Sequence, residues 1–381
     1  MMVSTTVDLA SDQAQVIAAA APGPSAADPG LAAKVAFLSQ PGSYPEPTTH
    51  VEAVETHMSW VFLTDRHAWK LKKPVRYDYL DFSTEAARHR DCEEELRLNR
   101  RLTSGVYLDV VPLTQDAAGQ LHLGPRAAVV DWLVRMRRLP RERMLDRMTR
   151  NGRVRFDDLR NAIRVLCRFY SGCAPIAMTA GEYRERLARS IADNLRDLST
   201  PEFALPVELF EPTCTRLAAL LDRESALFWE RSRTGRIVEG HGDLRPEHIC
   251  LLREPQIIDC LEFSRDFRIL DPADELAFLA LECERLGAPG LKRTIFDAYT
   301  EFSGDVPPAT LVHFYQSHRA CMRAKVALWH LKDPALADSP IWPAQARDYL
   351  RLAREHLERS RSPRVGPASQ EPCNSTIEPP A

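Results

Sequence analysis

The sequence predicts an α+β protein with a small N-terminal part of mainly antiparallel strands and a larger, mostly helical C-terminal part. Short apolar, β-favouring segments cluster between about residues 45 and 134 and surround one strongly helical segment. After about residue 140, segments with amphipathic helical spacing dominate. A polar loop and a short apolar strand at residues 240–262 interrupt these helices, and each of the two carries a carboxylate.

In the N-terminal part, residues 34–138, apolar and alternating runs predict strands on both sides of one helix. The helix is predicted over residues 85–102, which are rich in helix formers, and Ser83 or Thr84 can cap it. The strands are predicted at residues 60–64, 68–72, 110–113, 121–123 and 128–134.

The C-terminal part, residues 139–360, is predicted to be mostly helical, with a hinge near residues 135–139. Residues 1–33 and 361–381 are rich in small residues and proline without a sustained amphipathic period, so both are predicted to be disordered tails. The helices are predicted at residues 156–170, 183–198, 207–231, 274–286, 292–302, 308–331 and 343–360.

Composition restricts the class of protein. The chain has 381 residues, of which 44% are hydrophobic and 27% charged, and a formal net charge of −3. These values are typical of globular proteins and favour neither nucleic acid nor a membrane as partner. No apolar run approaches the roughly 18 residues of a spanning helix, and the N-terminus lacks the basic start of a secretory signal. Nine cysteines without a CxxC pair predict reduced thiols and a cytoplasmic location.

The most informative segment reads His-Gly-Asp-Leu-Arg-Pro-Glu-His-Ile at residues 241–249, followed by Gln-Ile-Ile-Asp-Cys at residues 256–260. Its two aspartates are Asp243, in the polar loop, and Asp259, at the end of the apolar strand. A hairpin between them would bring both acids to the same end of a small sheet. One acid can then orient a hydroxyl while the other holds a divalent metal, which is the division of labour that phosphoryl transfer requires.

These two motifs, with Asp-Pro-Ala-Asp-Glu-Leu-Ala at residues 271–277, resemble the signature of aminoglycoside phosphotransferases and choline kinases. Those families form the small-molecule branch of the protein-kinase-like fold. The closest likeness is to a bacterial aminoglycoside-phosphotransferase-like subfamily, whose N-terminal half residues 55–63 and 70–75 resemble. The resemblance covers about residues 45–335 and implies two lobes, with nucleotide in the first and the acceptor in the second. Some members carry an additional P-loop kinase domain, which we expect this chain to lack.

The resemblance also implies roles for the two acids. Asp243 would accept or orient the proton of the acceptor hydroxyl, and Asp259 would be the main Mg²⁺ ligand, bridging the phosphates of ATP. Each residue also has a structural interpretation. Asp243 could stabilise a turn through neighbouring backbone amides. Asp259 could cap a turn or pair with an arginine such as Arg265 or Arg268.

His248 stands where the resembled families have asparagine. An imidazole nitrogen is a softer ligand than an amide oxygen and suits Mn²⁺ better than Mg²⁺. His248 is therefore a candidate for binding metal and nucleotide, or for orienting Asp243 by hydrogen bonding, and Glu247 could supply the missing oxygen ligand. Histidine in place of asparagine is also consistent with a pseudokinase, that is, a nucleotide-binding protein without turnover.

Lys70 and Lys72 lie on one face of a predicted strand, and one of them should reach the nucleotide phosphates and pair with a helix glutamate. The small residue two positions before it favours Lys70, although clustered lysines are also typical of an exposed edge strand. On the helix, Glu95 is preferred over Glu94 because leucines follow it at i+3 and i+7, although a solvated acidic face remains the alternative.

No glycine-rich phosphate loop is present. Residues 56–59 are a candidate to cover the phosphates, although a plain strand entry fits them better. Asp271 and Asp274 are interpreted as helix caps or loop supports. Arg319 and Arg323 are interpreted either as an anion-binding pair or as ordinary salt bridges.

The prediction is therefore an ATP-dependent phosphotransferase that acts on a hydroxyl of a small molecule, with Mg²⁺, or Mn²⁺ if His248 is a ligand. The alternative is a nucleotide-binding pseudokinase or regulatory module. A protein kinase is disfavoured because Asp259 is followed by Cys-Leu rather than Phe-Gly. Neither the acceptor nor the oligomeric state follows from the sequence.

Overall fold

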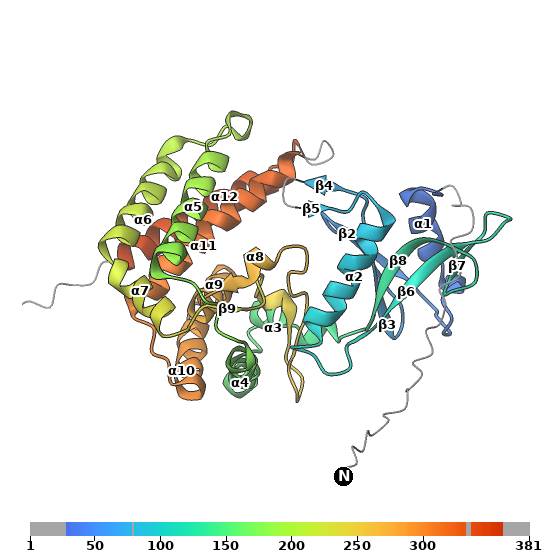
Figure 1. Ribbon diagram of the computed structural model, residues 1–381, viewed down its shortest axis with the longest axis horizontal. Coiled ribbons are helices and arrows are strands. Elements are labelled where there is room, and N and C mark those ends of the chain that lie inside the picture. The colour runs from blue at the N-terminus through green and yellow to red at the C-terminus, as the bar shows by residue number, and fades with distance from the viewer. Residues whose placement is uncertain (1–27, 78–79, 333–336, 361–381) are drawn as a thin grey trace, which may run out of the picture.

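The computed structural model describes residues 28–77, 80–332 and 337–360 and confirms the predicted two-part α+β architecture. Figure 1 shows the sheet with its two helices on the right and the mainly helical part on the left. None of the helices in these residues is long and apolar enough to cross a membrane.

The N-terminal part is built on one antiparallel six-stranded sheet with the order β1-β2-β3-β8-β6-β7. A separate two-stranded hairpin, β4 with β5, follows β3. The strands are β1 (Glu52–Glu55), β2 (Ser59–Leu63), β3 (His67–Lys72), β4 (Arg76–Tyr77), β5 (Leu80–Asp81), β6 (Tyr107–Gln115), β7 (Leu121–Leu123) and β8 (Ala128–Arg137).

Helix α2 (Glu85–Asn99) covers one face of this sheet, and the Thr84 hydroxyl caps it by accepting a hydrogen bond from the Ala87 N–H. Successive side chains of a strand point to opposite faces, so β3 divides its residues between two cores. Trp69 and Leu71 join the core on the side of helix α1 (Leu31–Leu38). Lys70 and Lys72 therefore project toward α2.

The predicted N-terminal tail was too long, because α1 begins at Leu31, within the range assigned to that tail. The rest of that tail up to residue 27, and the predicted tail at residues 361–381, lie outside the described residues. The predicted helix over residues 207–231 is also wrong in part: the chain forms two helices there, separated at Glu224, whose backbone leaves the helical conformation.

The C-terminal part packs its helices around α9, which is buried along nearly its whole length. Asp271 caps α9 by accepting a hydrogen bond from the Ala273 N–H, as one interpretation predicted. The helices are α3 (Leu145–Arg150), α4 (Phe156–Gly172), α5 (Ala180–Leu198), α6 (Glu211–Arg223), α7 (Ser225–Arg233), α8 (Arg265–Arg268), α9 (Pro272–Arg285), α10 (Leu291–Ser303), α11 (Ala309–Trp329) and α12 (Ile341–Arg359).

Two short antiparallel strand pairs hold the loops of the site. The first pair joins β9 (Val238–Glu239) to β12 (Ile269–Leu270), and the second joins β10 (Ile249–Cys250) to β11 (Gln256–Ile257). The polar loop therefore leaves β9 and passes through the 3₁₀ turn η5 (Pro246–His248) into β10. The chain then turns, returns along β11 and reaches Asp259, as the predicted hairpin requires.

Candidate functional site

The loop after β9 is fixed by a buried carboxylate of α9. Glu275 accepts hydrogen bonds from the backbone N–H groups of His241 (2.9 Å) and Gly242 (2.6 Å). Gly242 has a positive φ of 90°, and a Cβ there would lie 3.1 Å from both Arg268 and Leu261, so a side chain is excluded. This anchoring determines the position of the next residue, Asp243.

His241 connects this loop to the returning strand. Its Nε2 donates to the Ile258 carbonyl at 2.9 Å, while its Nδ1 accepts from the Asp243 N–H at 3.3 Å. Desolvation lowers the pKa of His241 to about 4, so the ring stays neutral near pH 7. The loop that carries Asp243 and the strand that leads to Asp259 are therefore held by one buried ring.

The Asp243 carboxylate lies beside the half-buried guanidinium of Arg245. Arg245 Nε donates to Asp243 Oδ2 at 3.0 Å, and Arg245 Nη1 donates to Glu247 at 2.6 Å. Desolvation by burial would raise the pKa of Asp243, but the charges of Arg245 and its other basic neighbours lower it to about 2. The carboxylate is therefore ionised near neutral pH, the state in which it can accept a hydrogen bond from a hydroxyl.

His248 lies between the two acids. Its Nδ1 donates to the Asp243 carbonyl at 2.8 Å, so in the neutral ring Nε2 carries the lone pair. Nε2 is 3.3 Å from Asp259 Oδ2, and the guanidinium of Arg245 lies 3.2 Å from the same nitrogen. His248 can thus stabilise the loop through Nδ1 and offer Nε2 to a metal at the same time.

Asp259 adopts a left-handed backbone conformation with φ 61°, which is strained for a residue other than glycine or asparagine. Two N-terminal residues hold it there. Its N–H donates to the hydroxyl oxygen of Tyr107 at 3.1 Å, and the next N–H, of Cys260, donates to Asn99 Oδ1 at 2.9 Å. The position of this carboxylate is therefore fixed from the opposite part of the molecule.

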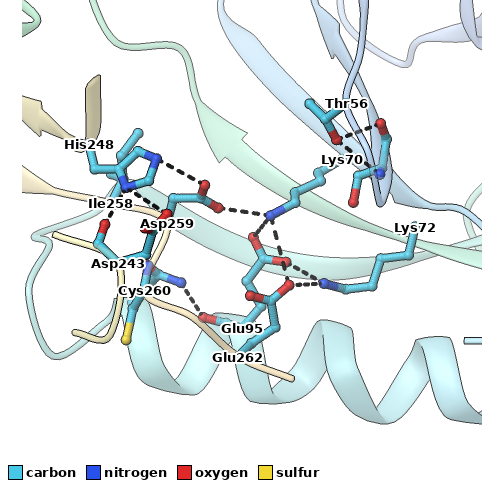
Figure 2. A network of polar contacts seen from close by, with 12 residues as sticks. Thr56, Lys70, Lys72, Glu95, Asp243, His248, Ile258, Asp259, Cys260 and Glu262 are labelled. Carbon is cyan, nitrogen blue, oxygen red and sulfur yellow. Dashed lines mark hydrogen bonds and ion pairs between the residues drawn. The ribbon is translucent and has the colours of Figure 1, made fainter. Parts of the chain in front are cut away.

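Lys70 connects the two parts of the molecule. Its Nζ donates to Glu95 on α2 and to Asp259 on the C-terminal loop, each at 2.9 Å, as Figure 2 shows. Burial opposes the charge of Lys70, but the carboxylates of Asp259 and Glu95 raise its pKa well above the ordinary value. Burial likewise opposes ionisation of Asp259, but Lys70 holds the pKa of this acid well below its usual range.

Lys72 forms a second, deeper set of contacts in the same network (Figure 2). It is fully buried and lies 2.7 Å from Glu95, 2.6 Å from Asp91 and 2.5 Å from Glu262. Glu95 thus joins both lysines, whereas Glu94 pairs with Arg97 and Arg268. The two lysines differ in surroundings: Lys70 reaches the partly exposed Asp259, and Lys72 is enclosed by carboxylates.

The predicted candidates Lys70, Glu95, His248 and Asp259 are brought together, and Asp243 lies directly beside His248. Asp259 pairs with Lys70 rather than with Arg265 or Arg268, both of which contact Glu239. Four charged residues that complete the network were not predicted: Asp91, Arg245, Glu262 and Glu275. Three of them had a local signal, because Arg245 and Glu262 each lie within three residues of a predicted acid and Glu275 lies in the motif at residues 271–277.

Residues 56–59 form the tight turn between β1 and β2. The Thr56 hydroxyl donates to the Ser59 carbonyl at 2.8 Å and accepts from the Ser59 N–H at 3.0 Å. This turn lies over Lys70 in Figure 2. Because its hydroxyl is used to close the turn, Thr56 fits a strand entry at least as well as a phosphate contact.

The side chains that could hold a divalent cation are the carboxylate of Asp259 and the imidazole of His248. Within the described residues no group of three or more His, Cys, Asp and Glu side chains could hold a metal. Asp259 Oδ2 and His248 Nε2, 3.3 Å apart, match neighbouring ligands of an octahedral ion, which are about 3 Å apart for bonds of about 2.1 Å. Mg²⁺ at nucleotide sites characteristically uses one or two carboxylates together with phosphate oxygens, so Asp259 fits that role, whereas the imidazole of His248 is the softer ligand of the pair.

Comparison with known proteins places these observations among relatives. No family model matches the chain. The uncharacterized protein Rv2004c of Mycobacterium tuberculosis (strain ATCC 25618 / H37Rv) is 33% identical over 312 residues, which are 81% of this chain and 60% of the relative. The uncharacterized protein Mb2027c of Mycobacterium bovis gives the same values. This chain thus spans about 60% of the length of these curated relatives.

Three solved structures align with most of the chain. A choline/ethanolamine kinase family protein from Mesorhizobium loti is 18% identical with a TM-score of 0.46, covering 86% of this chain and 94% of its own. The AMP-bound spectinomycin phosphotransferase APH(9)-Ia is 12% identical with a TM-score of 0.47, covering 85% of this chain and 98% of its own. A thermostable mutant of aminoglycoside phosphotransferase APH(4)-Ia is 12% identical with a TM-score of 0.49, covering 81% of this chain and 95% of its own. The chain is thus similar in sequence to these two mycobacterial proteins.

Proposed function

We propose that this protein is an ATP-dependent phosphotransferase that moves the γ-phosphate to a hydroxyl of a small molecule. One observation carries the proposal: Lys70 Nζ lies 2.9 Å from the carboxylates of both Glu95 and Asp259. The lysine of the N-terminal sheet therefore contacts the C-terminal aspartate that is the candidate metal ligand. Phosphoryl transfer depends on such a positioned array of charges, because its catalysis is mostly orientation and charge neutralisation.

Each residue then has a defined task. Lys70, oriented by Glu95, binds nucleotide phosphates, and Asp259 with His248 holds the divalent cation. That cation, when bound, neutralises charge on the phosphates. Asp243 accepts the hydroxyl proton while the acceptor oxygen bonds to the γ-phosphorus, the bond from phosphorus to the bridging oxygen of ADP breaks, and the proton passes on to solvent.

The setting is proposed to be cytoplasmic. The eight cysteines in the described part of the chain are free thiols, and all but Cys173 are buried. Free thiols persist in the reducing interior of the cell, whereas secreted proteins more often pair them.

A nucleotide-binding pseudokinase is the second candidate, and the position of Arg245 favours it. This guanidinium contacts Asp243 and lies 3.2 Å from His248 Nε2, so one cation engages both the proposed base and a proposed metal ligand. An enzyme must move Arg245 aside or use it on the phosphates, whereas a binding module can keep it in place.

We expect ATP with Mg²⁺ or Mn²⁺ to stabilise the purified protein against heat. At a hundredfold excess over the dissociation constant, a ligand of the folded state adds about 2.7 kcal/mol. The measurement is a thermal melt with ATP and metal together, each alone, and AMP as the control. An unchanged melting temperature with millimolar ATP and metal would contradict both candidate functions, and binding without ADP formation across an acceptor panel would leave the pseudokinase.

His248→Asn is expected to lower the ratio of the Mn²⁺-supported to the Mg²⁺-supported rate, because an amide oxygen is a harder ligand than an imidazole nitrogen. The measurement is ADP formation with each metal for both proteins, and the matched control is His122→Asn, the same change at the β7 histidine that contacts Asp116. A variant that loses activity with both metals equally would show that His248 braces the loop instead of ligating the cation.

A further inference from the structure

Two arginines, Arg285 on α9 and Arg323 on α11, surround the buried carboxylate of Glu282 and the ring of Tyr349. The Tyr349 hydroxyl donates to Glu282 at 2.6 Å, and Arg285 Nε donates to the same carboxylate at 3.0 Å. Arg323 Nε lies 3.4 Å from the Tyr349 hydroxyl and 3.6 Å from Glu282. Both guanidinium groups also lie against the Tyr349 ring, 5.3 Å and 5.7 Å from its centroid.

These contacts orient both arginines through Nε and leave their terminal amino groups unused. Within the residues that the structure describes, no hydrogen bond joins the Nη atoms of Arg285 or Arg323 to another residue. The two side chains are 26% and 16% exposed, so a solute can reach them. With Glu282 as the carboxylate between them, the cluster keeps one net positive charge.

Arg319, one helical turn before Arg323, is different. Its Nε and Nη2 donate to the two carboxylate oxygens of Asp274 at 2.8 Å and 2.7 Å, which neutralises it. Of the two α11 arginines considered from the sequence, Arg319 is therefore an ordinary buried salt bridge. The Nη atoms of Arg323 donate no hydrogen bond to another described residue, so they can donate to an anion.

The cluster lies on the same helix that holds the Asp243 loop. Glu282 follows Glu275 by seven residues, so it lies on the same face of α9 about 10 Å farther along the axis. Glu275 anchors the backbone immediately before Asp243. The charge of Arg323 also contributes, after those of Arg245 and His248, to the lowered pKa of Asp243. A small molecule with its hydroxyl at Asp243 can therefore span the interval to the arginines.

We infer that Arg285 and Arg323 form an anion-binding subsite for the acceptor, which is then a hydroxylated small molecule that also carries a phosphate or carboxylate group. The inference rests on the proposed function, because it assigns the second group of the same substrate. Guanidinium groups match the paired oxygens of both anions. The same charge disfavours cationic acceptors such as choline and aminoglycosides, since unlike charges bind and like charges repel.

The test uses two series of acceptors with the same number of carbon atoms and different anionic groups: glycerol, glycerate and glycerol 3-phosphate, then glucose, gluconate and glucose 6-phosphate. Choline and an aminoglycoside are the cationic members. ADP formation is measured for the wild type, Arg323→Gln, Arg285→Gln and the control Arg351→Gln, whose arginine is exposed on α12 and pairs with Glu355. We expect turnover of anionic members, an acceptor KM raised at least about tenfold in Arg323→Gln, an unchanged ATP KM, and no change in the control. The carboxylate and phosphate members show which anion is used.

A binding measurement keeps the inference testable if no member of the panel is turned over. In the presence of ADP and Mg²⁺, the anionic members should raise the melting temperature of the wild type further, and Arg323→Gln should lose this additional shift. The absence of any such shift, or turnover of a neutral or cationic member that Arg323→Gln leaves unchanged, overturns the inference. An absent response to ATP and metal overturns the proposed function instead, so the two failures are distinguishable.

Discussion

Asp243→Asn is expected to lower turnover by about 10²–10⁴-fold, roughly 3–5 kcal/mol of transition-state stabilisation, while ATP binding changes little. The amide cannot accept the hydroxyl proton, although it retains the size of the carboxylate and its anchoring through the Glu275-bound loop. Nucleotide binding should persist because Lys70, Glu95 and Asp259 do not contact the Asp243 side chain. The measurement is ADP formation with an identified acceptor, alongside a thermal shift with ATP and Mg²⁺.

Glu247→Gln is the matched control for Asp243→Asn, because Glu247 is also a carboxylate bonded to Arg245 on the same loop. Removing that charge should alter turnover far less than Asp243→Asn does. Equal losses in the two variants would mean that neutralising Arg245, rather than accepting a proton, explains the effect. Full turnover in Asp243→Asn would show that the assigned role is wrong.

The lowered pKa of Asp243 also sets the expected dependence on pH. Its folded-state pKa of about 2 lies below the ordinary 3.8, so the carboxylate stays ionised throughout pH 5–8. Protonation of Asp243 therefore causes no loss of turnover in that range. Its contribution to stability is complete above about pH 3.8 and disappears as the pH falls toward 2.

The two acids of the site could be predicted to lie together because they are close in sequence, whereas Lys70 and Asp259, 189 residues apart, were related only by the family resemblance. Asp243 and Asp259 are joined by one short hairpin, β10 with β11. The position of Leu98 indicated which face of α2 carries Glu95, whereas Leu102 lies beyond the end of this helix at Asn99. The network around Lys72 could not be predicted in the same way. Lys72 and Glu262 are 190 residues apart, and no periodicity relates a strand of one part to a loop of the other.

The helices and strands, too, could be predicted only where a local sequence pattern marks them. Long amphipathic helices such as α5 and α12 were predicted within about three residues of their ends, because their apolar stripe repeats with the helical period. The break at Glu224 has neither glycine nor proline to mark it, so only packing separates α6 from α7. Strand β1 is mostly exposed and lacks the apolar alternation of a half-buried strand, which is why it was missed.

Lys72→Met is expected to cost about 3–5 kcal/mol of the free energy of unfolding, because it removes the partner of buried carboxylates. Lys72 and Glu95 are fully buried, and Asp91 and Glu262 are nearly so. Desolvation already raises the pKa of Asp91 to about 7 despite the opposing charge of Lys72. Without that charge the pKa of Asp91 rises further, so the folded state holds a proton that the unfolded chain releases above its ordinary 3.8. The loss of stability should therefore be larger at pH 8 than at pH 5.5.

Urea unfolding followed by circular dichroism at these two pH values measures the effect, and Lys73→Met is the matched control. Lys73 directly follows the end of β3 and pairs with Glu55, whose side chain is 55% exposed. Such a pair contributes at most about 1 kcal/mol. Adding Glu262→Gln to Lys72→Met should recover part of the lost stability, because one unpaired carboxylate is then neutral. Equal unfolding midpoints for Lys72→Met and Lys73→Met would show that the buried network contributes no more than a surface ion pair, and Lys72 would then be free to act, like Lys70, on the nucleotide.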